Sequence, residues 1–433
     1  MSEVRRGYKQ TEVGVIPEDW EVDKLGTHAS FKTGPFGSTL HKSDYTDGGI
    51  PVINPMQIVD GKLCPTASMA ISEDAARKLA EFRLAAGNVV IGRRGDMGRC
   101  AYVGQGQDGW LCGTGSMILR TRPTLDARFI QRVLSSPQTI AAIENASVGS
   151  TMINLNQSTL SNLPIPLPPT RAEQETIAEA LSDADALIES LEQLLTKKCQ
   201  IKQGAMQELL TGKKRLPGFH SKPGYKRTEV GMIPEDWEVL PLGRRLLKTP
   251  SYGINAPAIP FDSRFPTYLR ITDITEEGRF AEATKASVDH PSSVAYLLEQ
   301  GDLVFARTGA SVGKSYLYDP DDGQLVFAGF LIRVTPDPEK LIPAFLAYFV
   351  QTRSYWNWVK VNSMRSGQPG INGREYASLP IPLPPTLAEQ TAIASVLSDM
   401  DSGLSVLENK LTKAQHLKQG MMQELLTGRT RLV

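Results

Sequence analysis

A stretch of about 50 residues occurs twice in this chain and limits its possible folds more than any other feature. Residues 163–212 and 379–428 begin 216 positions apart in a chain of 433 residues, so the repeat period is half the protein. Each copy opens on LPIPLPP, whose alternate prolines remove backbone donors and favour an extended chain. Each copy ends on MQELLTG. The chain is therefore predicted to contain one structural unit in tandem.

The residues after LPIPLPP carry the pattern of one long amphipathic helix. Thr170 and Glu173 form a capping box, which the second copy repeats, and Gly212 and Gly428 stand where a C′ glycine ends a helix. A helix of roughly 40 residues spans about 60 Å. Its narrow apolar stripe predicts that each long helix packs against the other as an intramolecular coiled coil. The stripe consists of Ile177, Leu181, Ala184, Ile188, Leu191 and Leu195 in the first copy, and Ile393, Leu397, Met400, Leu404, Leu407 and Leu411 in the second.

Gly204 and Gly420 lie inside this helical pattern. A glycine in a helix interior costs about 1 kcal/mol relative to alanine. Close approach of another backbone and a simple kink are equally good explanations for them.

A second repeat precedes each of two variable regions. Residues 8–22 and 225–239 share the pattern YK-x-TEVG-x-IPEDWEV and differ at two positions. Residues 23–162 and 240–378 share only a skeleton. Each has a strand, a Gly-rich turn and a strand, then a further strand (110–121 in the first) and a helical patch. Each variable region is predicted to be a mixed α+β domain of roughly 140 residues, a normal size for one domain.

The composition is that of a soluble globular protein. The hydrophobic fraction is 41%, and the formal net charge is zero, which argues against a non-specific polyanion binder. Four cysteines without a CxxC pair are expected to be free thiols in a reducing cytoplasm. No stretch has the length or apolarity of a signal peptide or membrane span, so we expect a cytoplasmic protein without membrane partners.

The sequence shows no arrangement of catalytic residues. RTGASVGKS (307–315) resembles a phosphate-binding loop, but its glycine spacing is one residue short and a strand-like YLY follows instead of a helix. A tight turn that presents Arg307 and Lys314 explains it better. We expect a chain that is not an enzyme and that binds no cofactor or metal.

Basic and amide side chains gather at the predicted turns of both variable regions. Arg, Asn and Gln read base edges, and Arg and Lys also hold phosphates. The alternative is that surface turns are generally rich in such residues, and Phe36 beside them is either exposed or buried. The candidate DNA-binding residues are Arg93, Arg94, Arg99, Asn154, Asn156, Gln157, Arg307, Lys314, Arg365, Gln368, Asn372 and Arg374.

The doubled YKxTExGxIPEDWE, LPIPLPPxxAEQ and MQELLTG elements resemble the specificity subunit of Type I restriction–modification systems over essentially the whole chain. The resemblance implies two target recognition domains in a pseudo-twofold tandem repeat, separated by two long antiparallel helices that form a coiled coil. Each domain would read one half of a split double-stranded DNA target, and the helices would set the spacer. The expected divisions are 1–162 and 213–378 (frame segment plus recognition domain), and 163–212 and 379–433 (long helices).

The same resemblance implies the partners. Two methyltransferase subunits, which use S-adenosylmethionine to methylate adenine, would bind this subunit, and restriction subunits with translocase and nuclease activity would join through them. Two alternatives remain. One is a coiled-coil scaffold that binds proteins without reading DNA, and the other is a nucleotide-binding enzyme that uses Lys314 in the turn at 307–315.

Overall fold

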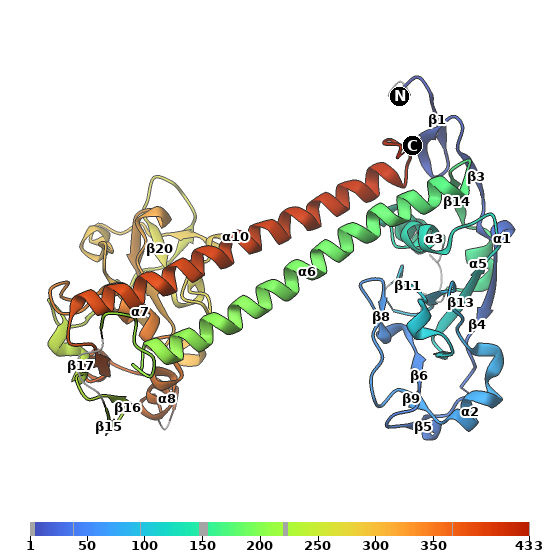
Figure 1. The fold of residues 1–433 in the computed structure, drawn as a ribbon. Helices are drawn as coiled ribbons and strands as arrows, with labels where there is room; N and C mark the ends of the chain where they lie inside the picture. The colour runs from blue at the N-terminus through green and yellow to red at the C-terminus, as the bar shows by residue number, and fades with distance from the viewer. Residues whose placement is uncertain are drawn as a thin grey trace. The chain divides into compact units, whose positions relative to one another are not determined.

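The computed structural model describes residues 5–37, 39–95, 97–146, 155–219, 224–365 and 367–432. The chain forms two compact units, one made of Met1–Glu192 with Lys410–Val433 and the other of Gln193–Asn409 (Figure 1). The first unit is discontinuous in sequence, because the end of the chain returns to it. No helix in the described part of the chain is both long and apolar enough to cross a membrane.

The variable region of the first unit forms one α+β domain, the expected recognition domain, which contains two four-stranded sheets. One is antiparallel with strand order β11-β10-β13-β4; the other has the order β12-β6-β9-β5, with β12 parallel to β6. Helices α3 (Ala127–Leu134), α4 (Pro137–Ala146) and α5 (Gln157–Ser161) complete the domain. The strands are β4 (Ala29–Thr33), β5 (Tyr45–Thr46), β6 (Ile50–Ile53), β9 (Ala70–Ile71), β10 (Val89–Gly92), β11 (Cys100–Tyr102), β12 (Leu111–Cys112) and β13 (Ser116–Thr121).

The continuous apolar run of β10 is explained by burial on both faces. Val89 and Ile91 belong to the core that also contains the helix α3, whereas Val90 between them packs into the core shared with the second sheet. Successive side chains of a strand point to opposite faces, so a strand between two cores needs no polar alternation. The single strand predicted over 110–121 is wrong: Gly113–Gly115 separate β12 from β13, and the chain changes sheet there.

The second unit repeats this architecture. Its strand orders, β18-β25-β22-β23 and β19-β21-β20-β24, again combine an antiparallel sheet with one that includes a parallel pair. Its helices are α7 (Pro343–Phe349), α8 (Arg353–Asn362) and α9 (Gly373–Ala377). The strands are β18 (Ser251–Tyr252), β19 (Ile259–Pro260), β20 (Thr267–Leu269), β21 (Ala286–Ser287), β22 (Leu303–Ala306), β23 (Ser315–Leu317), β24 (Leu325–Phe327) and β25 (Leu331–Val334). The predicted tandem α+β fold is confirmed.

The repeated segments form an identical frame in each unit. A hairpin, β1–β2 in the first unit and β15–β16 in the second, precedes a strand that pairs antiparallel with the proline-rich segment. Alternate prolines suit that segment, because it pairs with one strand along a single edge. The nitrogen atoms of the prolines, which carry no hydrogen, face the opposite edge, where no hydrogen bond to a strand is needed. The frame strands are β1 (Tyr8–Thr11), β2 (Gly14–Pro17), β3 (Glu21–Lys24) and β14 (Pro164–Leu167), and β15 (Tyr225–Thr228), β16 (Gly231–Pro234), β17 (Glu238–Pro241) and β26 (Pro380–Leu383).

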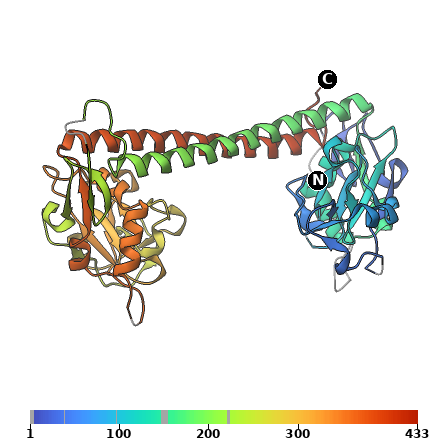
Figure 2. The same ribbon diagram turned by 60° about the horizontal axis from the view of Figure 1, so that its bottom comes forward.

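The two long helices are α6 (Arg171–Leu209) and α10 (Leu387–Leu425), of 39 residues each. They lie side by side and antiparallel within each unit (Figure 2). In the first unit Lys418 of α10 pairs with Asp185 of α6 at 2.5 Å, and in the second Lys202 of α6 pairs with Asp401 of α10 at 2.5 Å. The predicted helices and their antiparallel pairing are confirmed.

Two adjacent residues at the start of each long helix, a glutamate and a glutamine, contact two other segments of the same unit. Gln174 accepts a hydrogen bond from the Asp126 N–H, 2.8 Å away, at the start of α3, and it donates to the Thr124 carbonyl at 3.3 Å. Gln390 does the same for the Ile342 N–H, at 2.9 Å, before α7. The preceding glutamate, Glu173 or Glu389, binds an arginine from the segment that follows the opposite long helix.

That arginine belongs to what we call the tail ion-pair cluster. In the second unit it consists of Arg215, Asp236 and Glu389, which are at most 6% exposed, with Arg215 bonded to Glu389 at 2.5 Å and to Asp236 at 2.8 Å. In the first unit Arg431 binds Glu173 and Asp19 in the same way. The structure shows one half of the predicted capping box, since Thr170 accepts from the Glu173 N–H at 3.2 Å, whereas the Glu173 carboxylate binds Arg431.

The glycines at the helix ends and in the helix interiors differ in their environments. Gly212 and Gly428 have φ values of +69° and +66°, as a C′ glycine requires, and a Cβ atom on Gly212 would lie 2.5 Å from Pro234. A Cβ atom on Gly204 or Gly420 would meet no atom within 4 Å. The prediction that another backbone approaches these two glycines closely is therefore wrong. The helices α6 and α10 continue through them without interruption.

Replacing Gly204 by alanine is expected to raise the free energy of unfolding by up to about 1 kcal/mol, because alanine restricts the unfolded chain and meets no atom in the helix. Gly212→Ala is the matched contrast and should lower the free energy of unfolding. It forces the alanine backbone into a left-handed conformation and brings the alanine Cβ against Pro234. Urea unfolding of both variants measures the difference. A lower midpoint for Gly204→Ala than for the unaltered chain would contradict this account.

Removing Arg215 is expected to cost about 3–5 kcal/mol, because the 1% exposed Glu389 would lose the arginine of its buried ion pair. Arg215→Met measured by urea unfolding gives this cost, and adding Glu389→Gln should recover part of it. Arg431→Met is the control in the first unit. It should cost less, since Arg431 is 28% exposed and Asp19 is 54% exposed. Equal and small effects of both arginine substitutions would count against the cluster as a stabilising element.

Candidate nucleic-acid interface

Three loops meet at the same place in each recognition domain, and we call them the loop platform. In the first unit the Arg93 N–H donates to the Gly115 carbonyl at 2.9 Å, and the Leu155 N–H donates to the Arg93 carbonyl at 2.9 Å. In the second, the Arg307 N–H donates to the Phe330 carbonyl at 3.0 Å, and the Ile371 N–H donates to the Arg307 carbonyl at 2.9 Å. The backbone of the platform is therefore the same in both units.

The platform of the first unit contains four of the candidate DNA-binding residues. Arg93 donates from Nε to the Leu155 carbonyl at 2.9 Å, and burial and the charge of Arg94 lower its pKa. Arg94 itself is exposed. Asn156 caps α5 by accepting from the Thr159 N–H at 2.8 Å, and the exposed Gln157 donates to a threonine of β4. The candidate Asn154 lies outside the described residues.

The platform of the second unit holds its candidates through different contacts. The Arg307 guanidinium lies over the Tyr252 ring, 4.8 Å from the centroid. The amide of Gln368 packs against Gly309, which has a φ of +73°. Asn372 caps α9 through the N–H groups of residues 374 and 375, and Arg374 on that helix is exposed.

Three candidates are directed elsewhere or paired with other groups. Arg99 donates to the Pro55 carbonyl at 3.4 Å and lines a groove facing α6. Lys314 pairs at 2.7 Å with Glu276, which lines the corresponding groove of the second unit. Arg365 pairs with Glu375 at 2.5 Å. The predicted tight turn at 307–315 is present as a 3₁₀ turn at Gly309–Ser311, and strand β23 follows it where a phosphate-binding loop would have a helix.

Exposed apolar side chains accompany the platforms and were mostly missed from the sequence. Phe330 is 58% exposed and Tyr252 is 43% exposed in the second unit, while Phe36 is 70% and Met56 is 74% exposed in the first. Of these, Phe36 alone was singled out from the sequence, and the structure settles it as exposed. Phe330 could have been found from its place between two strand patterns, in the sequence AGF, where a turn must form.

A groove lies between each recognition domain and the paired helices. Its volume is about 900 Å³ in the first unit and about 1120 Å³ in the second. The helix wall has four residues in common: Asp185, Lys418, Gln419 and Met422 correspond to Asp401, Lys202, Gln203 and Met206. The domain wall differs. Arg132 of α3 contacts Asp185 at 2.6 Å, whereas the hydroxyl of Tyr348 in α7 bonds Asp401 at 2.8 Å.

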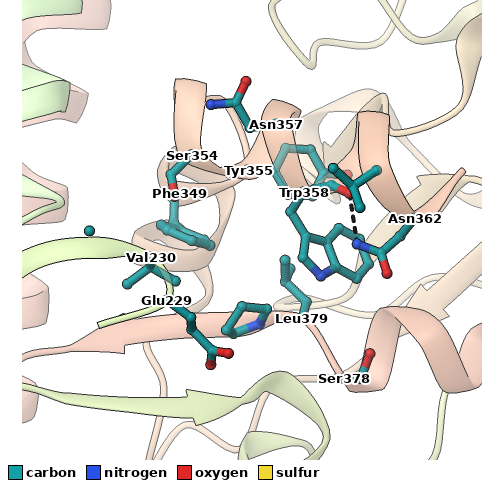
Figure 3. Close-up of a pocket in the computed structure, with 13 residues that line it drawn as sticks. Glu229, Val230, Phe349, Ser354, Tyr355, Asn357, Trp358, Asn362, Ser378 and Leu379 are labelled. Carbon is teal, nitrogen blue, oxygen red and sulfur yellow. Dashed lines mark hydrogen bonds between the residues drawn. The ribbon is translucent and has the colours of Figure 1, made fainter. Parts of the chain in front are cut away.

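A second cavity lies on the frame. In the second unit, Figure 3 shows Phe349 and Trp358 facing Leu379, with Glu229 and Val230 of the hairpin beside them. The cavity has a volume of about 510 Å³. The corresponding place in the first unit holds two smaller cavities of about 140 and 350 Å³, and Val133 and Ala142 stand there at the positions of Phe349 and Trp358. Each frame therefore presents the same hairpin and proline strand beside a different helix surface.

Comparison with known proteins identifies the family. The family model described as Type I restriction modification DNA specificity domain matches residues 17–198 and 268–416, which is more than half of the chain. The putative type I restriction enzyme MjaX specificity subunit of Methanocaldococcus jannaschii is 26% identical, with 98% of this chain and 97% of the relative covered. The EcoKI specificity subunit of Escherichia coli is 24% identical, with 96% and 90% covered.

A solved structure shares the fold. The S subunit of a Type I restriction–modification system from M. genitalium has a TM-score of 0.59 and 15% identity, and the match covers 98% of both chains. The two matched segments of the family model fall in the two halves of the repeat, as expected for two specificity domains in one chain. The chain belongs to the Type I restriction–modification DNA specificity family.

Proposed function

We propose that each recognition domain reads one half of a split double-stranded DNA target through its loop platform. The observation that carries this proposal is the combination of one backbone with two sets of side chains. Arg93 and Arg307 occupy the same backbone position, yet Arg93 is bonded to the Leu155 carbonyl and Arg307 is stacked on Tyr252. Base edges are read by side chains, so domains that share a backbone but differ in side chains suit two different half-sites.

The repeated frames suit two copies of one partner. The tail ion-pair cluster, the hairpin and the proline strand recur in both units, and the helix wall of each groove has an Asp, a Lys, a Gln and a Met at matching positions. Identical surfaces in a tandem repeat offer identical docking sites. We propose that each frame docks one methyltransferase subunit, through which restriction subunits join, and that the chain itself supplies recognition and no catalysis.

Single-molecule methylation sequencing of host DNA tests DNA reading directly. The gene for this chain is deleted while the gene for its methyltransferase is kept. A split motif that carries N6-methyladenine is expected to disappear on deletion and to return when the gene is restored. A split motif that persists without this chain would contradict the proposal. If the chain still assembled with the methyltransferase but no methylation depended on it, a protein scaffold would be the better description.

The helix pair is expected to set the spacer between the half-sites. One heptad is inserted into α6 between Glu192 and Gln193, and another into α10 between Asn409 and Lys410, where the compact units divide. Seven helical residues add about 10 Å, and a base pair of B-DNA occupies about 3.4 Å, so the spacer should grow by about three base pairs.

Matched insertions preserve the antiparallel register, and a whole heptad nearly preserves the phase of the apolar stripe. Methylation sequencing should show a longer spacer and two unchanged half-sites. An insertion in α6 alone is the control, because it shifts one helix against the other and should lower methylation. An unchanged spacer in the matched variant would show that the helices do not fix it.

A further inference from the structure

Arg307 differs from its counterpart in how its side chain is held. Both arginines are fixed through the backbone by the same pair of hydrogen bonds to neighbouring loops. The Arg93 side chain then returns to the protein, with Nε donating to the Leu155 carbonyl at 2.9 Å. No described residue accepts a hydrogen bond from Nε of Arg307. Nε of Arg307 therefore has no acceptor among the described residues, whereas Nε of Arg93 is bonded to a backbone carbonyl.

Tyr252 provides a fixed surface for the Arg307 guanidinium. The ring centroid lies 4.8 Å from the guanidinium carbon, a distance at which the aromatic face attracts the cation. The tyrosine is held from both sides, because its backbone pairs with Ile332 of β25 and its hydroxyl accepts from the Gly373 N–H at 3.1 Å. A planar guanidinium stacked on a fixed ring keeps its donors in one plane, which lowers the entropy cost of a two-point contact.

The surroundings of Arg307 leave its charge available. Lys314 and Arg365 each pair with a glutamate, but no described carboxylate forms an ion pair with Arg307. Phe330, whose carbonyl accepts the Arg307 N–H, is 58% exposed, and Tyr252 is 43% exposed, so this part of the platform is open to solvent. The Arg307 cation, which has no ion-pair partner among the described residues, thus lies over Tyr252 in a part of the platform where Tyr252 and Phe330 are exposed.

We propose that Arg307 is a specificity-determining residue that reads a guanine in the half-site of the second domain, with Tyr252 as its positioning residue. This inference rests on the proposed function. Arginine contacts O6 and N7 of guanine with two parallel hydrogen bonds, which is the commonest specific contact in the major groove. Arg93, whose side chain is bonded to the protein backbone, is assigned to holding the platform of the first domain together.

The test compares methylation rates of duplexes by the purified complex of this chain with its methyltransferase. The duplexes carry the wild-type motif or a single replacement of each guanine in turn. For Arg307→Ala, one guanine in one half-site should lose about five- to 150-fold of its preference over the replacement base, and the other half-site should be unchanged. Arg307→Lys keeps the positive charge but removes the two parallel N–H donors of the guanidinium, so it should lower the preference for guanine at the same position.

Tyr252 and Arg93 supply the controls. Tyr252→Phe keeps the ring and loses only the hydroxyl contact to the Gly373 N–H, so it should keep most of the guanine preference, whereas Tyr252→Leu removes the stacking surface and should lower it further. Arg93→Lys loses the Nε bond to the Leu155 carbonyl, so it should slow methylation without relaxing any guanine of the second half-site. If Arg307→Ala fails to assemble with the methyltransferase, Arg307→Lys carries the test alone.

The possible outcomes distinguish a failure of the Arg307 assignment from a failure of the proposed function. A wild-type complex without a split motif would overturn the proposed function itself. A split motif whose half-sites contain no guanine, or whose guanine preferences survive both Arg307 substitutions, would overturn only the assignment of Arg307. Slower methylation at all sites with every guanine still required would make Arg307 a phosphate contact, which also overturns base reading.

Discussion

The structure of each unit depends on the Glu–Gln pair at the start of its long helix. Gln174 and Gln390 bind the backbone at the start of a recognition-domain helix, and Glu173 and Glu389 bind an arginine that follows the opposite long helix. Three segments that are far apart in sequence are therefore fixed at one turn of helix. Buried carboxylates make this arrangement selective, because a charge in such a place is tolerated only with its partner present.

Much of the architecture follows from local patterns in the sequence. The helix bounds, the left-handed glycines at the helix ends, the extended proline segments and the free cysteines are all consequences of propensity, capping and composition. The partner of Glu173 could not be predicted in this way, because Arg431 lies 258 positions along the chain and a capping box explained the glutamate equally well. Local patterns specify elements, whereas contacts between distant segments depend on the completed fold.

The candidate DNA-binding residues were likewise predicted in part by local sequence and in part not. Turns rich in Arg, Asn and Gln pointed to loop residues that lie on or beside the loop platform, and Arg94 and Arg374 are exposed there; that this surface binds DNA stays a prediction. The sequence did not separate the residues that the platform uses for its own structure. Asn156 and Asn372 cap short helices, and Arg99 and Lys314 belong with the grooves that face the long helices. These roles depend on the direction of each side chain, which in a turn follows no regular period and cannot be read from composition.

The discontinuous first unit has a consequence for how the protein is made. The second unit is one continuous segment, Gln193–Asn409, and has all of its residues before Lys410 is added. The first unit lacks Gly428 and Arg431 until the whole of the second unit has been made, although its recognition domain is synthesised first. Domains usually fold in the order of their synthesis. In this chain the first recognition domain emerges early but its frame is closed only after the second unit has been made, so a chain interrupted between Asn409 and Gly428 has one finished half and one open half.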